Sequence, residues 1–506
     1  MFPSFSLRYA QLPARMSAEC DPTPVAAPRL VAFNHALAGE LGFDAAAFDA
    51  GEAAEALSGN APPAGSAPLA MAYAGHQFGN FVPRLGDGRA LLLGEVIDRG
   101  GQLRELQLKG AGRTPFSRGG DGRAPLGPVL REYLVSEAMH ALGIPTTRAL
   151  AAVTTGERVL RRLPEPGAVL TRVAGSHLRV GTFQYFAARR DVEAIQLLAD
   201  MAIERHYPHL EPLSGGGRYL ALLEAVIARQ AELVARWMGV GFIHGVMNTD
   251  NTTISGETLD YGPCAFMDVF EPRTVFSSID ERGRYAFSNQ PHSAQWNLAR
   301  FAETLLSLLD DDHERAVALA TDAIEAFPEH FEASWGAVKR AKLGLSKAEE
   351  GDEALAQELL DAMQAGHADY TLTFRRLADV LDVREGESDG REGPVSDSGE
   401  ARLVELFDSP EAITAWLSRW RDRLAREDAD AEAIAARLRA TNPAVIPRNH
   451  LVEQALTAAI EHDDFGPFEA LLAVVTRPFE APDEGEVDYT RPPEANERVL
   501  RTFCGT

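Results

Sequence analysis

The spacing of hydrophobic and polar residues divides the chain into two parts. In the first part, up to about residue 173, short apolar runs are separated by turns that contain glycine. Such runs are typical of β-strands, and they predict strands at residues 90–96, 104–110 and 167–173. Residues 128–142 instead repeat their apolar positions with the period of a helix. The first part therefore predicts strands with one helix among them.

From residue 218 onward, the apolar positions follow helical spacing. The pattern predicts helices at residues 218–239, 297–309, 430–439 and 452–460. The first of these is expected to end at Gly239 with a glycine cap, because glycine is common where a helix stops. Residues 44–68 are rich in Ala, Gly and Pro, and they predict loops and short helices.

The order of these elements, strands first and helices afterwards, predicts an α+β protein with two lobes and a helical C-terminal extension. Residues 384–400 are rich in charge, Gly and Ser, so we expect a disordered surface insertion there. The expected division is an N-terminal extension packing on the core at 1–74, an N-lobe at 75–175, a mainly helical C-lobe at 176–383, the insertion at 384–400, and a helical extension with a Cys-containing tail at 401–506.

The composition indicates a soluble globular protein with a strong negative charge. Hydrophobic residues make up 45% of the 506 residues and charged residues 24%, which allows a sizeable core. Asp and Glu number 74 against 49 Lys and Arg, so the net charge is −25. A field of that sign repels nucleic acid and anionic membrane surfaces, and we expect neither as a partner. Clustered Arg and Lys residues are therefore informative.

Cysteine content and sorting signals point to a reducing compartment. Cys20, Cys264 and Cys504 do not form a disulfide framework or a zinc-type CxxC pair. No apolar run approaches the roughly 20 residues of a membrane span. The N-terminus lacks the continuous apolar region of a signal peptide, although its mildly basic character leaves a transit peptide open. We expect a bacterial cytoplasmic protein, and the sequence leaves its oligomeric state open.

A glycine turn precedes the first predicted strand. Gly86 and Gly88 flank one residue and Arg89 follows directly. Glycine allows the backbone to approach a ligand closely, and an Arg can hold a phosphate through two hydrogen bonds. The alternative is an ordinary hairpin turn.

The next candidates follow the order found in the N-lobe of a protein kinase. Lys109 closes the second predicted strand, and Glu132 lies on the predicted helix. In kinases such a Lys holds phosphates, and such a Glu orients the Lys through an ion pair. Taken singly, either residue would more often lie on the surface.

Cations gather in and after the glycine-rich segment 109–128. This segment carries Arg113, Arg118 and Arg123 beside Asp121. It is either a flexible solvent loop or, in so acidic a protein, a segment that encloses an anion. Four cations from separated segments would suit a triphosphate; they are Arg89, Lys109, Arg172 and Arg179.

A polar stretch after the long helix matches the spacing of a kinase catalytic loop. Asn251 follows His244 by seven positions, as in that loop, and Asp260 begins a D-Y-G sequence in place of D-F-G. Asn and Asp oxygens suit Mg²⁺. The usual base position is Val246, which cannot accept a proton, so Asp250 is the nearby carboxylate able to act as a base. The alternative is an Asx-rich turn that caps local backbone.

The chain resembles the selenoprotein O family, whose members have a kinase-like fold. The resemblance rests on "KGAGRTPFSRGGDGRAPLGPVLREYLVSEAMHALGIPTTRAL", "HGVMNTDNTTISGETLDYGP" and the near-terminal "FCGT", and it covers nearly the whole chain. It implies a protein adenylyltransferase that binds ATP reversed relative to kinases. Such an enzyme moves AMP to Ser, Thr or Tyr hydroxyls of other proteins and releases pyrophosphate. The resemblance also implies transfer of UMP with Mn²⁺.

The resemblance assigns roles to individual residues. Asp250 would accept the proton, Glu132 would pair with Lys109, and Asn251 and Asp260 would hold Mg²⁺. Nucleotide binding would fall to Gly86, Gly88, Arg89, Lys109, Asp121, Gly122, Arg172, Arg179 and Asp260. The family also associates the C-terminal tail with a redox link to the active site, for which Cys264 and Cys504 are available; a small buried hydrophobe is the other interpretation of Cys264.

Three functions fit these residues. The first is AMP transfer to protein hydroxyls, the second is ordinary γ-phosphoryl transfer, and the third is a catalytically silent nucleotide-binding scaffold. Val246 argues against the second, because it leaves the usual base position without a base. The intact pair of Asn251 and Asp260 argues against the third.

Overall fold

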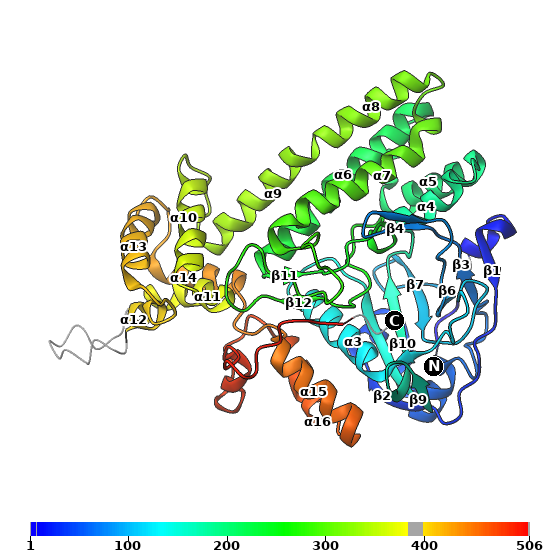
Figure 1. Ribbon diagram of the computed structural model, residues 1–506, viewed down its shortest axis with the longest axis horizontal. Coiled ribbons are helices and arrows are strands. Elements are labelled where there is room, and N and C mark those ends of the chain that lie inside the picture. The colour runs from blue at the N-terminus through cyan, green and yellow to red at the C-terminus, as the bar shows by residue number, and fades with distance from the viewer. Residues whose placement is uncertain (1, 7, 383–397, 504–506) are drawn as a thin grey trace.

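A computed structural model of the chain describes residues 2–6, 8–382 and 398–503. Within these residues, one antiparallel sheet lies at one end of the molecule and helices make up most of the rest (Figure 1). The strands run in the order β1-β3-β6-β7-β10-β9-β2, and β8 pairs with β10. Their bounds are β1 Ser17–Glu19, β2 Arg29–Phe33, β3 Leu69–Met71, β6 Ala90–Ile97, β7 Leu103–Lys109, β8 Ala124–Pro125, β9 Arg148–Leu160 and β10 Pro164–Ala174. The expectation of a mixed helix and strand protein is confirmed.

The three strands predicted from short apolar runs form the centre of this sheet. β6 and β7 make an antiparallel hairpin in which Ala90 lies opposite Lys109, and β10 pairs with the other edge of β7. Side chains alternate between the two faces of a strand. Glu105, Gln107 and Lys109 therefore project from one face of β7 while Leu106 and Leu108 are buried on the other. One face of β7 thus carries polar groups toward the site described below.

The N-terminal residues contribute strands to the same sheet. β1 pairs with β3, β3 pairs with β6, and β2 pairs with β9. Two helices follow β2, α1 (His35–Glu40) and α2 (Ala50–Ser58). Of these, α2 lies within residues 44–68, where short helices were expected. These strand pairings join residues far apart in the sequence.

The predicted helix at 128–142 is α3 (Leu126–Ala141), and it packs against the sheet. Its residues are buried on nearly every side, because β9 and β10 cover one face and two C-terminal helices cover another. Those two helices are α15 (Asn449–His462) and α16 (Gly466–Val475). Burial on all sides explains why α3 carries apolar residues beyond a single stripe.

The helical half is built around α6 (Gly215–Gly239), which packs on α7 (Gln290–Leu309) and α9 (Phe327–Lys342). Gly239 is the last helical residue of α6, as predicted, but it does not supply the cap. The left-handed glycine is Gly241, with φ of 73°. The helix therefore continues to its predicted end, and the chain reverses one residue beyond Val240.

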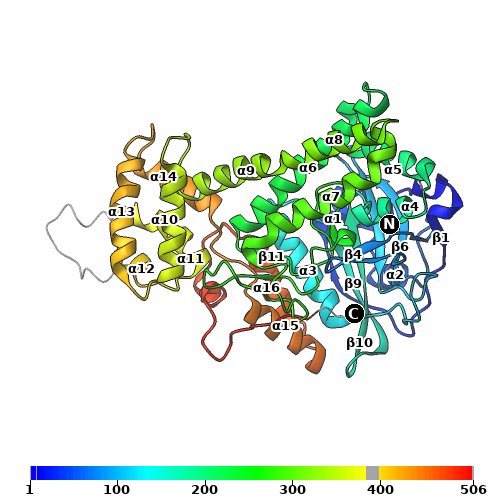
Figure 2. The same ribbon diagram turned by 45° about the horizontal axis from the view of Figure 1, so that its top comes forward.

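The remaining helices complete the two ends of the helical half. Figure 1 and Figure 2 show α10–α14 gathered at the end of the molecule opposite the sheet. The bounds of α10–α14 are α10 Asp352–Ala365, α11 Tyr370–Val380, α12 Gly399–Val404, α13 Pro410–Leu424 and α14 Ala431–Thr441. The other remaining helices are α4 Val180–Ala187, α5 Val192–His206 and α8 His313–Glu325. The expected insertion 384–400 falls outside the described residues except for 398–400, where Ser398 caps α12. No helix among the described residues has both the length and the apolar character to cross a membrane.

A buried lysine lies where α9 meets the helical end group. Lys342 is 4% exposed, and its ammonium lies 4.1 Å from the centre of the Phe374 ring and 5.3 Å from that of Tyr370. Burial lowers the pKa of Lys342 to about 7. An aromatic face attracts a cation, but it replaces only part of the lost hydration.

We expect Lys342→Met to raise the free energy of unfolding at pH 7 by on the order of 1 kcal/mol. Between about pH 7 and the ordinary pKa of 10.5, the unfolded chain holds a proton that the folded chain has released. Wild-type stability therefore gains from rising pH in this window, and the advantage of the variant should shrink toward alkaline pH. Thermal melts at both ends of the window test this, with exposed Lys347→Met as the control. An advantage that does not change with pH would contradict it.

Candidate active site

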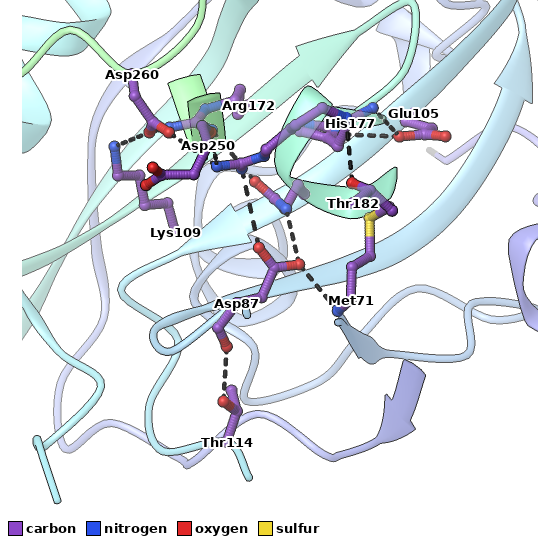
Figure 3. Close-up of polar contacts among 12 residues, drawn as sticks. Met71, Asp87, Glu105, Lys109, Thr114, Arg172, His177, Thr182, Asp250 and Asp260 are labelled. Carbon is purple, nitrogen blue, oxygen red and sulfur yellow. Dashed lines mark hydrogen bonds and ion pairs between the residues drawn. The ribbon is translucent and has the colours of Figure 1, made fainter. Parts of the chain in front are cut away.

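Four charged side chains meet where the sheet faces the helical half. Lys109 ends β7, Glu132 lies on α3, Arg172 lies on β10, and Asp260 comes from the loop after the predicted catalytic loop. The Lys109 ammonium lies 2.6 Å from Glu132 and 2.7 Å from Asp260. The Arg172 guanidinium lies 2.6 Å from Glu132 and 2.5 Å from Asp260. The predicted pair of Lys109 and Glu132 therefore forms, and Arg172 joins it in the same cluster. Figure 3 shows Lys109 and Arg172 beside Asp260.

Asp260 is the most strongly paired carboxylate of this cluster. Besides Lys109 and Arg172, it accepts a hydrogen bond of 3.2 Å from Arg179. Burial by itself raises the pKa of Asp260, but the three cations outweigh burial and bring the pKa well below its usual range. Its backbone is left-handed, with φ of 64°, which is uncommon for a residue other than glycine. The surrounding cations hold this carboxylate ionised and fixed.

Asp250 lies close to this cluster but outside its ion pairs. It belongs to the short 3-10 helix Thr249–Asn251 and is 8% exposed. Its Oδ1 atom is buried without a hydrogen-bond partner, and burial raises the pKa of Asp250 to about 6. The backbone carbonyl of Asp250 accepts a hydrogen bond of 2.9 Å from Arg179. Asp250 thus keeps one buried carboxylate oxygen without a hydrogen-bond partner beside the cluster.

A hairpin of β4 (Gly75–Gln77) and β5 (Asn80–Val82) lies against this loop. A Cβ atom at Gly75 would be 2.5 Å from Asp250 Oδ1, so only glycine fits there. The His76 amide donates to Thr249 Oγ1 at 2.7 Å, and the Phe78 amide donates to Asn248 Oδ1 at 3.0 Å. The hairpin therefore holds the side chains of the two residues that precede the candidate base, a role that the sequence did not reveal.

The amide of Asn251 is oriented by the loop itself. Its Nδ2 donates to the Val246 carbonyl at 3.0 Å, which leaves the Asn251 side-chain oxygen for a metal ion. His244 is buried and bonds through Nε2 to the Leu259 carbonyl at 3.0 Å, so it joins the loop to the segment before Asp260. Asn251 and Asp260 supply hard oxygen donors, as Mg²⁺ requires. The described residues contain no group of three or more His, Cys, Asp or Glu residues that could hold a metal, so phosphate oxygens or waters would complete the shell.

The glycine turn is packed against protein rather than left open. Gly86 has φ of 67°, and a Cβ atom there would be 2.3 Å from the Phe116 ring. Ser117 Oγ donates to the Gly88 carbonyl at 2.5 Å. The backbone of Arg89 accepts from the Gly110 amide at 2.7 Å, which brings the turn beside Lys109. The glycines make room for the loop that follows β7, and their role in nucleotide binding remains a prediction.

Asp121 and Gly122 lie in that same loop. Asp121 pairs with Arg161 near the tip of the β9–β10 hairpin at 2.8 Å and accepts from the Arg123 amide at 2.9 Å. A Cβ atom at Gly122 would be 2.0 Å from the Gly112 carbonyl oxygen. The contacts of both residues are thus within the loop and the hairpin, whereas Lys109, Arg172 and Arg179 meet at Asp260. Arg161 was missed because its partner is 40 positions away.

The structure describes only one cysteine of the expected redox pair. Cys264 is buried, with 1% of its surface exposed, four residues after Asp260. Cys504 lies outside the described residues. Thr502, close to it in sequence, donates to the Pro263 carbonyl at 2.6 Å, so the tail runs beside the segment that carries Cys264. A redox link between Cys264 and Cys504 remains a prediction.

Proteins similar to this chain over its whole length are nucleotidyltransferases by name. A protein of Rhizobium rhizogenes strain K84, "Protein nucleotidyltransferase YdiU", is 58% identical over 502 residues, covering 99% of this chain and 97% of the relative. A protein of the same name from Rhodopseudomonas palustris strain BisB5 is 59% identical over 504 residues, with 99% of each chain covered. A family model described as "Protein adenylyltransferase SelO" matches residues 3–476. The chain therefore belongs to the SelO family of protein adenylyltransferases.

Proposed function

We propose that this chain transfers AMP from ATP to Ser, Thr or Tyr hydroxyls of other proteins and releases pyrophosphate. The observation that carries the proposal is the partnerless Oδ1 of Asp250 beside a cluster in which three cations surround Asp260. Cations of this kind suit a polyphosphate, and a free carboxylate oxygen suits a hydroxyl that must lose its proton. Family membership and the names of the relatives support the same activity.

The kinase-like organisation is part of this proposal. In it, residues 75–175 form the N-lobe and 176–383 the C-lobe, with 1–74 packed on the core and 401–506 as the helical extension. An antiparallel sheet whose strand Lys pairs with a Glu on a packed helix supports this division. The nucleotide-binding roles of Gly86, Gly88, Arg89, Asp121 and Gly122 rest on the family resemblance. A bacterial cytoplasmic location remains an expectation from the sequence.

The reaction follows from the positions of the charges. Lys109, Arg172 and Arg179 would bind the far phosphates of ATP, so that the α-phosphorus faces Asp250. The acceptor hydroxyl oxygen forms a bond to that phosphorus as the bond to the β-phosphate oxygen breaks, and pyrophosphate leaves. Asp250 takes the hydroxyl proton. Asn251 and Asp260 would hold a divalent ion, Mg²⁺ or for UMP transfer Mn²⁺, which offsets charge on the phosphoryl oxygens.

Labelled nucleotides distinguish the candidate functions. We expect acceptor proteins to become labelled when they are incubated with this protein, Mg²⁺ and α-³²P-ATP. We expect no label from γ-³²P-ATP, because the reversed nucleotide presents its α-phosphorus to Asp250. Label from γ-³²P-ATP only would show ordinary phosphoryl transfer and contradict the proposal. No label from either nucleotide would favour a silent scaffold.

A further inference from the structure

We propose that Asp87, between the two glycines of the turn, is a positioning residue that orients Arg179 for nucleotide binding. The inference rests on the ATP-binding part of the proposed function. The family resemblance gives roles to the residues on both sides of Asp87 and none to Asp87 itself. Its contacts join the glycine turn to Arg179, which donates a hydrogen bond to the Asp250 carbonyl.

Asp87 is anchored through both its backbone and its carboxylate. It is 1% exposed, and its amide donates to the Met71 carbonyl at 3.0 Å. Met71 returns a hydrogen bond of 3.0 Å to Asp87 Oδ2, and Gln107 Nε2 donates to the same oxygen at 3.4 Å. The hydroxyl of Thr114 donates to the Asp87 carbonyl at 2.6 Å (Figure 3). Four contacts therefore fix Asp87, two at its backbone and two at its carboxylate.

The free side of the carboxylate faces Arg179. Asp87 Oδ1 lies 3.9 Å from Arg179 Nη2, too far for a hydrogen bond but close enough for strong attraction between buried charges. The other nitrogen of the same guanidinium bonds to the Asp250 carbonyl and to Asp260. The ring of Tyr73 lies 4.6 Å from the guanidinium carbon. Arg179 is thus held between the glycine turn at one end and the catalytic loop at the other.

Asp87 could anchor the glycine turn or orient Arg179, and the chemistry of its side chain separates these two roles. An amide at this position could still accept the hydrogen bond from Met71, so anchoring the turn does not need a negative charge. The charge acts mainly on Arg179 and more weakly on Arg172, because the three hydrogen-bonding partners are neutral groups. Burial raises the pKa of Asp87 to about 6, against the opposing effect of Arg179, so the carboxylate is ionised at neutral and alkaline pH.

A double-mutant cycle on ATP binding tests the assignment. The full-length wild type, Asp87→Asn, Arg179→Ala and the double variant are titrated with ATP and Mg²⁺ by calorimetry at about pH 8, above the pKa of Asp87. We expect Asp87→Asn to weaken ATP binding about tenfold. In the Arg179→Ala background the same change should have no further effect. Asp98→Asn, on the β6–β7 turn, serves as the matched control and should bind ATP as the wild type does.

A purely structural role would give a different result. Loss of affinity from Asp87→Asn that is equally large in the Arg179→Ala background would overturn the assignment, as would unchanged affinity in a variant that folds. If Asp87→Asn does not fold, Arg179→Lys replaces it. A lysine keeps the charge but cannot reach Asp87 and the Asp250 carbonyl together, so wild-type affinity in that variant would also overturn the assignment.

Binding is measured apart from transfer, so the two proposals fail separately. ATP binding with the expected coupling, but with label moved from the γ position only, would contradict AMP transfer and leave the role of Asp87 intact. AMP transfer without coupling between Asp87 and Arg179 would contradict the role of Asp87 and leave the proposed AMP transfer intact. Absence of ATP binding by the wild type would overturn both.

Discussion

Asp250→Asn is expected to lower the rate of AMP transfer by about 10²- to 10⁴-fold while ATP affinity stays close to that of the wild type. Asp250 forms no ion pair with the cations proposed to hold the phosphates, and Arg179 bonds to its backbone carbonyl, which the substitution keeps. An amide has the size of the carboxylate and fits against Gly75, but it cannot take the acceptor's proton. The loss should therefore appear in the chemical step.

The measurement is single-turnover labelling of an acceptor protein at saturating ATP, combined with calorimetric ATP titration of the same preparation. Single-turnover conditions separate the chemical step from product release. Asp98→Asn is the control, since it makes the same chemical change on the β6–β7 turn and should label acceptors at the wild-type rate. Normal labelling by Asp250→Asn would remove Asp250 as the base, and a large loss of ATP affinity would show that it binds nucleotide instead.

Local signals in the sequence predicted the elements that hold the site. Apolar runs predicted β6, β7 and β10, and helical spacing predicted α3 to within two residues at its start and one at its end. Once these elements pack, the order of Lys109 and Glu132 is enough to predict their ion pair, which the structure contains. Motif spacing likewise brought Asp250, Asn251 and Asp260 into one region. Short-range pattern and motif order therefore account for the centre of the site.

The contacts that the sequence did not reveal join distant segments or depend on packing. Phe116 fills the space above Gly86, and nothing in the glycine spacing distinguishes a ring from a phosphate as the occupant. Asp121 pairs with Arg161 on another hairpin, a partner that only the strand register defines. The alternation of Glu105, Gln107 and Lys109 could have indicated a polar face on β7. That alternation does not identify the partners of Asp87, because those partners follow only from the fold.

The second large effect is expected at Asp260, because it is both a candidate metal ligand and the counter-charge of three cations. Asp260→Asn should lower AMP transfer about 1,000-fold, since the amide weakens the metal site where charge develops in the transition state. The same change removes a negative charge from the region proposed for the phosphates. Lys109, Arg172 and Arg179 then face ATP with less competition from protein carboxylates.

Without metal, the Asp260→Asn variant should therefore bind ATP more tightly than the wild type, by about fivefold. Calorimetric titration in EDTA measures this affinity, and Mn²⁺ binding in the presence of ATP, followed by electron paramagnetic resonance, should weaken in the same variant. Opposite effects on metal and on metal-free nucleotide distinguish this role from simple damage to the fold, which would weaken both. Weaker binding of metal-free ATP would contradict the view that Asp260 competes with phosphate for the cations, and transfer at the wild-type rate would remove Asp260 from the metal site.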